Sequence, residues 1–284
     1  MKNVDILIVG GGAAGIAAAK SAYEAGCEKI ALVDRKEALG GVLRQCLHRG
    51  FGQNQNGQEY AENLVRGFPE EIAVYTNTTM LSVTKGRQAY LSGGETVQFR
   101  QLILATGCRE IPMGALPIVG SRPKGIYTAG QMQEKMNLQG FLPEGPAVIL
   151  GSGDLGLVMA AHLAQAGIPV TMVEQKSFCG GMARNQRCLD VYPIELICDA
   201  TVTEVLGERK MEGCILSTGE TIPCKTLLIA VGLKPERELV LDLGNPEWLH
   251  ICGNCNHVHP MVEAVVNEGK MAGIAAWNSI RGSV

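Results

Sequence analysis

The stretch Asp5–Ala19, DILIVGGGAAGIAAA, joins an apolar β-branched run to a GxGxxG turn and an alanine-rich segment. Residues 147–165, AVILGSGDLGLVMAAHLAQ, repeat the same order. Three spaced glycines match easily by chance in a chain with 36 glycines, so the flanking segments carry the argument. In each copy a second apolar run follows and ends in an acid, Asp34 or Glu174. The sequence therefore predicts two βαβ units, each with a tight glycine turn.

Each part of such a unit has a physical role in binding a dinucleotide. The first glycine permits the turn, the second lets the backbone approach a diphosphate, and the third lets helix and strand pack closely. The diphosphate then meets unpaired N–H groups at the positive end of the helix dipole. Asp34 and Glu174 stand near the spacing at which a carboxylate binds an adenosine ribose, and an acid there repels a 2′-phosphate.

We therefore predict two dinucleotide sites with electron transfer between the bound cofactors, and NAD(H) rather than NADP(H) beside Glu174. The alternative is two glycine turns that bind no ligand.

Charge and composition disfavour several classes of partner. The 284 residues include 25 basic and 28 acidic ones, for a net charge of −3, and no basic cluster is interleaved with aromatic residues. Nucleic acid and an anionic membrane surface are therefore not expected as partners. The apolar run Ile6–Ala19 contains the glycines of the first turn, so we do not interpret it as a secretory signal, and no segment reaches the length of a membrane span. We expect a cytoplasmic protein.

The ten cysteines are scattered along the chain, and we expect free thiols that mostly serve packing. Cys252 and Cys255 form a CxxC pattern, which suits a redox pair, half of a metal site, or neither. A metal or iron–sulfur cluster needs about four ligands, and no second CxxC exists, so we predict no bound metal.

Alternating apolar segments with glycine turns follow both βαβ units, one over residues 73–107 and the other over residues 207–232. Each indicates a small antiparallel sheet that ends in an apolar strand and a glycine, Gly107 or Gly232. Three prolines between residues 112 and 123 suggest a linker. The second half of the chain thus repeats the plan of the first.

With these segments in place, the chain resembles the two-dinucleotide-binding-domain flavoproteins, the superfamily that includes thioredoxin reductase and glutathione reductase. The matching pieces are GGGAAG for FAD, LILATG as the returning strand, GSGDLG for NAD, LLIAVG as its counterpart, and the terminal CGNCNHVHPMVEAVVNEGKMAGIAAW. Pieces such as GGVLRQCLHRGFG and GMARNQRCLD are most similar to a group of bacterial NAD/FAD-dependent oxidoreductases. Members of that group are encoded with a flavoprotein that resembles glycerol-3-phosphate dehydrogenase and with a small cysteine-containing protein. The resemblance implies a subunit that works with a second flavoprotein, in a homo- or hetero-oligomer.

The resemblance also implies how FAD and NAD(H) are held. The turn before Asp34 would bind FAD, and the turn before Glu174 would bind NAD(H). Gly253-Asn254 stands where a Gly-Asp pair is usual, so the hydrogen bonds to the flavin cofactor are kept and the charge is lost. The residues expected to bind the cofactors are Gly10, Gly12, Ala13, Ala14, Gly15, Asp34, Arg35, Gly41, Gly107, Gly151, Gly153, Asp154, Leu155, Gly156, Glu174, Gly232, Gly253 and Asn254.

Two histidines are candidates for contact with the flavin. Pro260 suits the first turn of a helix that starts near Met261. In the resembled fold this helix points its N-terminus at the flavin, where its dipole would stabilise negative charge by roughly 0.3–1 kcal/mol. His257 or His259 would donate to the same edge of the ring. The alternative is that one histidine caps the turn and the other faces solvent.

Cys46 is the remaining candidate for catalysis. It stands alone where disulfide reductases of the superfamily carry a CxxxxC pair, and residues 127–145 contain no cysteine, so dithiol chemistry is not predicted. Cys46 is either a thiolate beside the flavin, with its pKa lowered by neighbouring basic residues, or a buried packing thiol.

We therefore predict an α/β fold of two Rossmann-like dinucleotide-binding domains, with the NAD-binding domain inserted in the FAD-binding domain. Residues 1–116 and 234–284 would form the FAD-binding domain and residues 117–233 the NAD-binding domain, joined by two connections that act as a hinge. Because the chain ends just after the helix that completes the FAD-binding domain, we expect no C-terminal interface domain.

The predicted function is that of an FAD-dependent oxidoreductase that passes electrons between NAD(H) and a partner, as a subunit of a multi-subunit dehydrogenase. Two alternatives remain from other classes. One is a self-contained NADH-dependent reductase or oxidase of a small acceptor, and the other is a non-redox nucleotide-binding scaffold.

Overall fold

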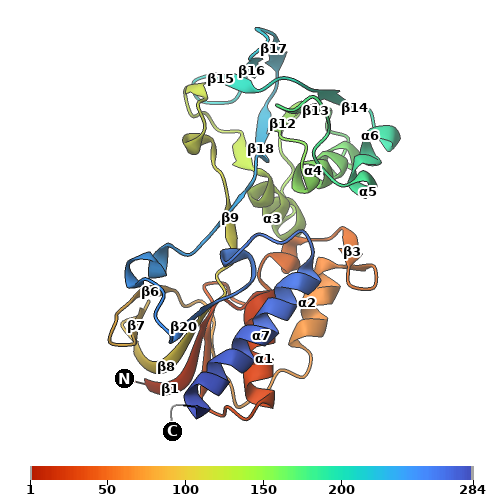
Figure 1. The fold of residues 1–284 in the computed structure, drawn as a ribbon. Coiled ribbons are helices and arrows are strands. Elements are labelled where there is room, and N and C mark those ends of the chain that lie inside the picture. Colours follow the sequence, from red (N-terminus) through yellow and green to blue (C-terminus); the bar gives the residue numbers. More distant parts are fainter. Residues whose placement is uncertain (1, 283–284) are drawn as a thin grey trace. The chain divides into compact units, whose positions relative to one another are not determined.

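The computed structural model describes residues 2–282, which fold into two compact units. Unit 1 contains the residues up to Arg109 together with those from Lys234 onward, and unit 2 is Glu110–Leu233. The polypeptide therefore leaves unit 1 once and returns to it once (Figure 1). Each unit has its own sheet and its own apolar core.

The main sheet of unit 1 consists of β1 (Lys2–Val9), β2 (Ile30–Val33), β5 (Ala73–Tyr75), β6 (Met80–Val83), β7 (Gln88–Leu91), β8 (Thr96–Leu104) and β20 (Leu249–Ile251). Their order is β5-β2-β1-β8-β7-β6, and β20 also pairs with β8. Ile6 and Ile8 belong to one core cluster, whereas Leu7 and Val9 belong to the other, because successive side chains of β1 point to opposite faces. Both faces are thus buried, which explains the continuous apolar run of this strand.

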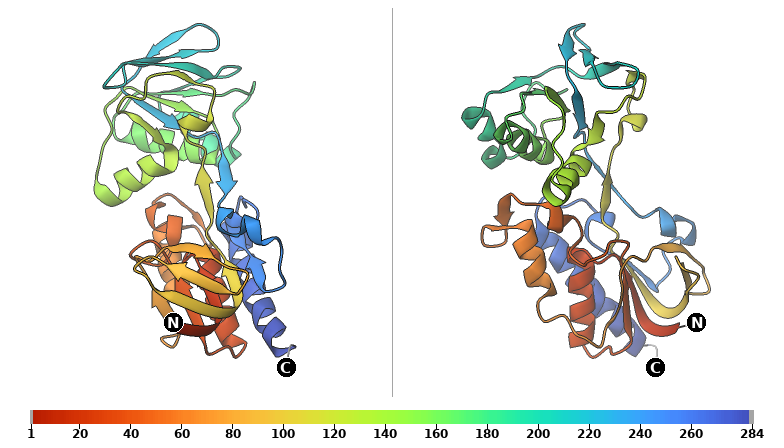
Figure 2. Two further views of the ribbon diagram at one scale, coloured as in Figure 1. Left: turned by 90° about the vertical axis from the view of Figure 1, so that its left-hand side faces the viewer. Right: turned by 180° about the vertical axis from the view of Figure 1, so that it is seen from behind.

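The helices of unit 1 are α1 (Ala13–Glu24), α2 (Gly57–Val65) and α7 (Val262–Arg281). They lie on the same face of the sheet, and α1 and α7 run side by side (Figures 1 and 2). A Cβ atom at Gly269 would lie 2.2 Å from the carbonyl oxygen of Ala14, and one at Gly273 would lie 2.3 Å from that of Ala18. Glycine at these two positions lets α7 touch the backbone of α1, so distant parts of the sequence share one core.

The antiparallel segment predicted over residues 73–107 is continuous with the parallel sheet rather than separate from it. β7 is antiparallel to β6 and β8, whereas β8 is parallel to β1 along nearly its whole length. β5 pairs with β2 in the parallel direction. The long strand β8 joins the two parts of the sheet, because its first residues pair with β1 on one edge and with β7 on the other.

Unit 2 repeats the parallel arrangement with strands β11 (Ile126–Thr128), β12 (Ala147–Leu150), β13 (Val170–Val173), β14 (Ile194–Ile197) and β18 (Thr226–Ile229). Their order is β11-β18-β12-β13-β14, and every pair is parallel. Val148 and Leu150 enter one core cluster, and Ala147 and Ile149 enter the other. The helices of the unit are α3 (Ala129–Gln139), α4 (Asp154–Gln165), α5 (Ala183–Gln186) and α6 (Cys188–Val191).

A second sheet of unit 2 is formed by β10 (Val119–Gly120), β15 (Val202–Leu206), β16 (Gly213–Leu216) and β17 (Thr221–Pro223), in that order. The antiparallel pairs of β16 with β15 and β17 agree with the alternation read from residues 207–232. Residues 112–123, for which the prolines suggested a linker, contribute β10 and the 3₁₀ turn η2 (Met113–Ala115) to unit 2. Backbone pairing with β15 therefore orders part of this proline-rich segment.

Short elements complete the chain: η1 (Gly41–Gln45), β3 (Arg49–Phe51), β4 (Gln55–Asn56), β9 (Cys108–Glu110), β19 (Leu233–Pro235), η3 (Glu238–Leu243) and η4 (Gly253–Cys255). β3 pairs with β4, and β9 with β19. Among the helices within residues 2–282, none combines the length and apolar character that crossing a lipid bilayer requires.

Candidate functional site

The first glycine turn follows β1, and its backbone requires glycine at two positions. Gly10 has φ +107°, and a Cβ there would lie 2.2 Å from the carbonyl oxygen of Ala105, the residue that follows β8. A Cβ at Gly15 would lie 1.7 Å from the carbonyl oxygen of Gly10. By contrast, the nearest atom to a Cβ at Gly12 is 4.0 Å away. The first and third glycines thus serve packing, and the second leaves space beside the turn.

The second glycine turn follows β12 and has the same geometry. Gly151 has φ +103°, and a Cβ there would lie 2.4 Å from the carbonyl oxygen of Ala230, which follows β18. A Cβ at Gly156 would lie 2.4 Å from the carbonyl oxygen of Gly151. Among the described residues, no atom lies within 4 Å of a Cβ at Gly153. Here too the middle glycine borders open space.

The helices that follow the turns begin without a side-chain cap. Gly12 is the N-cap residue of α1 and Gly153 is the N-cap residue of α4, and within residues 2–282 no side chain caps either helix. Ala13 and Ala14 at the start of α1 are buried, whereas Asp154 and Leu155 at the start of α4 are half-buried. Free first-turn N–H groups beside a space next to glycine fit a diphosphate.

The two predicted acids are buried, each with 8% of its surface exposed, and they hold the glycine turns. Asp34 accepts hydrogen bonds from the N–H of Gly11 and from the N–H of Lys36, the second at 2.7 Å. Glu174 accepts from the Ser152 N–H at 2.8 Å, the Ser152 hydroxyl at 2.6 Å and the Lys176 N–H at 3.0 Å. In both units the acid therefore bonds to the residue after the first glycine and to the residue two places beyond itself.

The charge state of Glu174 follows from these contacts. Burial alone would raise its pKa, but the hydrogen bonds from the Ser152 hydroxyl and from the N–H groups of Lys176 and Ser152, together with the Lys176 charge, outweigh burial. The pKa of Glu174 consequently lies below its usual value of 4.5, so this group carries a negative charge at neutral pH.

Paired glycines lie over both turns, and those of the second turn were not among the residues expected from the sequence. The Gly40 N–H donates to the Gly11 carbonyl at 2.8 Å, and a Cβ at Gly41 would lie 3.0 Å from the Cα of Gly12. In unit 2 the Gly180 N–H donates to the Ser152 hydroxyl oxygen at 2.8 Å. The available signal was a repeat, acid-x-Lys-x-x-x-Gly-Gly, in DRKEALGG (34–41) and EQKSFCGG (174–181).

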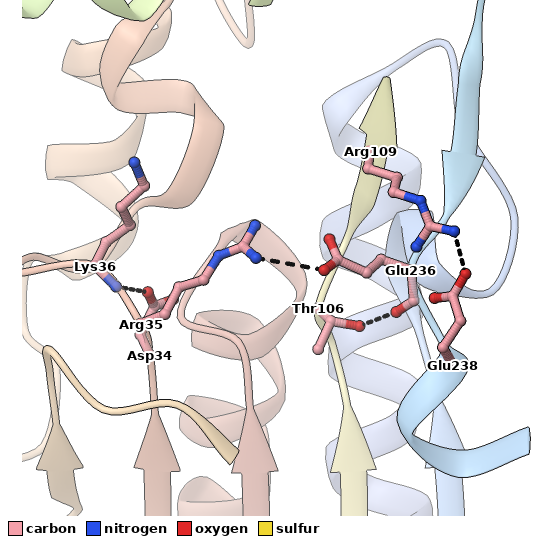
Figure 3. A network of polar contacts seen from close by, with 7 residues as sticks. All are labelled: Asp34, Arg35, Lys36, Thr106, Arg109, Glu236 and Glu238. Atoms are coloured by element: carbon pink, nitrogen blue, oxygen red, sulfur yellow. Dashed lines mark hydrogen bonds and ion pairs between the residues drawn. The ribbon is translucent and has the colours of Figure 1, made fainter. Parts of the chain in front are cut away.

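Arg35 does not lie against the glycine turn in this structure. Its guanidinium forms an ion pair with Glu236 at 3.3 Å, and its side chain is 61% exposed (Figure 3). In the same network the Thr106 hydroxyl donates to the Glu236 carbonyl, and Arg109 pairs with Glu238. These groups gather beyond the carboxyl ends of β2 and β8, the edge where parallel sheets bind ligands.

The glycines after the returning strands both have positive φ angles, +79° at Gly107 and +138° at Gly232. The Gly107 carbonyl accepts the Glu236 N–H at 2.9 Å, and the Gly232 carbonyl accepts the Ile111 N–H at 3.2 Å. Each glycine thus lies three residues beyond its strand in a left-handed conformation, and its carbonyl bonds the outgoing connection to the incoming one.

Gly253 and Asn254 lie against the start of α1. A Cβ at Gly253 would be 2.7 Å from the Cβ of Ala14, and the Gly253 N–H donates to Glu268 at 2.7 Å. The Asn254 side chain accepts the His259 N–H at 3.0 Å and donates to the Cys108 sulfur at 3.7 Å. The structure therefore brings this pair together with the first glycine turn inside unit 1.

The two histidines have different surroundings. His259 is half-buried, and its Nε2 lies 3.1 Å from the carboxylate of Glu268. His257 is exposed, and its ring meets the His259 ring edge-on at 5.3 Å between centroids. α7 begins at Val262 with Met261 as its N-cap, so Pro260 lies before the helix and not in its first turn as predicted. The extended backbone of Met261 delays the helix start.

Cys46 is 8% exposed, and its thiol donates to the Val42 carbonyl at 3.3 Å. Burial raises the pKa of this thiol to about 12. Burial is the cause of this shift, so the thiolate needed for a charge-transfer contact is disfavoured at neutral pH.

Cys252 and Cys255 are core thiols. Burial raises the pKa of both, and Cys255 donates to the carbonyl oxygens of Leu104 at 3.1 Å and Cys252 at 3.2 Å. All ten cysteines, which lie within residues 2–282, are thiols and not disulfides. In that part of the chain no three His, Cys, Asp or Glu side chains are grouped as a metal site would need.

Comparison with known proteins gives a family match over most of the chain. The model for pyridine nucleotide-disulphide oxidoreductases matches residues 4–247. The chain is 26% identical over 272 residues to a subunit of opine oxidase from Agrobacterium tumefaciens (strain Ach5), covering 83% of this chain and 53% of that one. It is 29% identical over 255 residues to rubredoxin-NAD(+) reductase of Ectopseudomonas oleovorans, covering 84% and 64%.

A solved structure shares the fold. The crystal structure of T. acidophilum thioredoxin reductase superposes with a TM-score of 0.82 and 20% sequence identity, over 99% of this chain and 100% of that one. The α/β fold is thus like that of thioredoxin reductase. The chain spans only 53% and 64% of the two relatives named above.

Proposed function

Since the chain belongs to the pyridine nucleotide-disulphide oxidoreductase family, we propose that it is an FAD-dependent oxidoreductase and that it passes electrons between NAD(H) and a partner protein through bound FAD. The duplicated glycine turn supports this most directly. In each unit a strand, an uncapped helix and a buried acid surround a space that only glycine leaves open. Two such turns provide for two dinucleotides.

Unit 1 is the proposed FAD site, and unit 2 is the proposed NAD(H) site. In unit 1 the Gly253-Asn254 turn packs on the start of α1 and so lies beside the first glycine turn. The exposed side chain of Val42, next to Gly41, offers an apolar surface there. The fold we propose is therefore a Rossmann-like NAD-binding domain inserted between the two parts of a Rossmann-like FAD-binding domain.

The residues of each unit bind and orient the cofactors. First-turn N–H groups of α1 and α4 would hold the diphosphates, and Asp34 and Glu174 keep the turns in shape while presenting a carboxylate to an adenosine ribose. When bound, the flavin itself supplies the two-electron chemistry. The dipole of α7 would favour negative charge near its N-terminus by roughly 0.3–1 kcal/mol.

Glu174 favours NAD(H) over NADP(H) in this proposal. Its low pKa keeps it ionised at neutral pH, and a fixed negative charge at the ribose repels a 2′-phosphate.

The proposed partner is a second dehydrogenase subunit, of the flavoprotein type related to glycerol-3-phosphate dehydrogenase. Cys46 is buried with a raised pKa, and neither known arrangement of redox cysteines is present in the sequence, so electrons would leave by a route other than a dithiol. One relative is named as a subunit of an oxidase, and another as a reductase that acts on rubredoxin. Both names describe proteins that work with another protein.

Anaerobic mixing of FAD-loaded protein with NADH and, separately, NADPH tests the proposal. We expect the yellow colour to bleach rapidly with NADH and slowly with NADPH. Rapid bleaching by NADPH alone would contradict the role of Glu174, and no bleaching by either would favour the non-redox scaffold.

Steady-state turnover distinguishes a subunit from a self-contained enzyme. We expect slow oxidation of NADH by the isolated chain with small dyes or oxygen, and co-purification with a second flavoprotein from the native cell. Rapid turnover with a small acceptor alone would favour a self-contained reductase.

A further inference from the structure

The two glycine turns differ in one charged residue. The helix after the first turn begins with Ala13, whereas the helix after the second begins with Asp154. If unit 2 binds NAD(H), as proposed above, the diphosphate approaches the start of α4. A carboxylate on the first helical residue would then stand beside two negative phosphates.

The structure shows where this carboxylate is held. Its Oδ1 accepts the Met182 N–H at 2.8 Å and the Asn185 side-chain amide at 2.6 Å. Met182 ends the loop after β13 and is the N-cap residue of α5, and Asn185 lies in α5 itself, so both donors attract the carboxylate toward the end of that loop.

The loop is itself fixed to the turn by other contacts. The Gln186 amide donates to the Gly181 carbonyl at 2.6 Å, and the Gly180 N–H donates to the Ser152 hydroxyl oxygen at 2.8 Å. A Cβ at Gly181 would lie 3.2 Å from the Asp154 nitrogen and 2.4 Å from the Leu157 side chain. The loop therefore packs closely enough on α4 to keep its donors in register with Asp154.

We infer that Asn185 is a positioning residue for dinucleotide binding in unit 2, because its amide holds the Asp154 carboxylate on the loop and away from the incoming diphosphate. The Asp154 carboxylate is then bonded to Met182 and Asn185 instead of standing free beside the diphosphate. Unit 1 needs no such residue, since Ala13 carries no charge. This inference assigns to the segment MARNQ (182–186) a role in the affinity of the second cofactor.

The test uses the FAD-loaded protein and ADP-ribose, which carries the adenosine and the diphosphate but cannot reduce the flavin. Binding is measured by isothermal titration calorimetry at low and at high salt. In Asn185→Ala only the Met182 N–H still holds the Asp154 carboxylate, so this negative charge moves more freely toward the diphosphate. We expect the Kd to rise about fivefold at low salt, and to rise less at high salt because ions screen the repulsion. Asn278→Ala, on the exposed side of α7 in unit 1, is the matched control and should bind like the wild type.

A second substitution separates repulsion from simple loosening of the loop. In Asp154→Asn/Asn185→Ala the charge is gone, so we expect the Kd to return to within about twofold of the wild-type value, a difference of about 0.4 kcal/mol. If Asn185→Ala had merely disordered the loop, ADP-ribose binding would stay weak in the double variant and would show no added salt dependence.

The outcomes also separate this inference from the proposed function. Wild-type protein that binds no ADP-ribose would overturn the NAD(H) site itself. Wild-type binding with an unchanged Kd in Asn185→Ala, or a weak double variant, would overturn only the role of Asn185.

Discussion

Changing Gly156 or Gly153 of the second turn to alanine should have different effects: the first substitution should lower stability, and the second should weaken dinucleotide binding. The methyl group of Gly156→Ala would meet the Gly151 carbonyl oxygen at 2.4 Å, whereas that of Gly153→Ala meets no described atom within 4 Å. Gly153 has φ −66° and ψ 173°, which alanine adopts without strain. The first substitution should therefore damage the fold, and the second should fill the space that a diphosphate needs.

The magnitudes follow from these contacts. Overpacking costs about 1–3 kcal/mol, and alanine offsets up to about 1 kcal/mol of this in a helix. With a net cost of about 1–2 kcal/mol, Gly156→Ala should lower the thermal midpoint of unit 2 by about 3–8 °C. Gly153→Ala should shift the midpoint by less than about 2 °C but weaken ADP-ribose binding at least about tenfold, or about 1.4 kcal/mol.

Thermal unfolding by circular dichroism and calorimetric titration measure the two effects on the same samples. The FAD content serves as the control, because the proposed flavin site lies in unit 1 and should stay fully loaded in both variants. A Gly153→Ala protein that binds ADP-ribose like the wild type would refute the placement of the diphosphate. A Gly156→Ala protein of unchanged stability would refute the packing argument.

Three further substitutions test other parts of the site. Glu174→Gln should make the free energy of unfolding less sensitive to acid. The pKa of Glu174 is lower in the folded protein than its unfolded value near 4.5, so the ionised group stabilises the fold above that pH, and this contribution is lost as the pH falls through the folded pKa. Denaturant unfolding between pH 7 and 3 measures the difference, and parallel pH profiles of variant and wild type would contradict it. Cys46→Ser should leave the visible spectrum of the flavin unchanged at pH 7, because a thiol with a pKa of about 12 is not ionised at that pH. If the wild type showed a long-wavelength absorption band that the variant lacks, Cys46 would be a thiolate. Asn254→Asp should make the flavin harder to reduce, because it places a negative charge beside the proposed site while keeping the oxygen that accepts the His259 N–H. A dye-coupled titration measures the reduction potential, and an equal or more positive value in the variant would argue against contact with the flavin.

Local sequence signals determined the parts of the fold that depend on near neighbours. The apolar runs around Gly10 and Gly151 predicted strands, and the alanine-rich segments after them predicted helices, because periodicity and turn chemistry act over a few residues. Asp34 and Glu174 were singled out because each ends an apolar run at a fixed spacing from its first glycine, and the structure brings each within hydrogen-bond distance of its turn. Membership of the pyridine nucleotide-disulphide oxidoreductase family was confirmed by the match over residues 4–247, whereas the likeness to the group encoded with a second flavoprotein stays a prediction.

Other features depend on contacts between distant segments, and only the tertiary structure decided them. Burial raises the pKa of Cys46, although basic residues are its neighbours in the sequence. Arg35 forms an ion pair with Glu236, which is far along the chain. The loop after β13 and helix α5 pack on α4, where Asn185 bonds to Asp154. This contact depends on the tertiary positions of both segments. Periodicity carries no information on such pairings, since they arise when folding brings separate elements to one edge of a sheet.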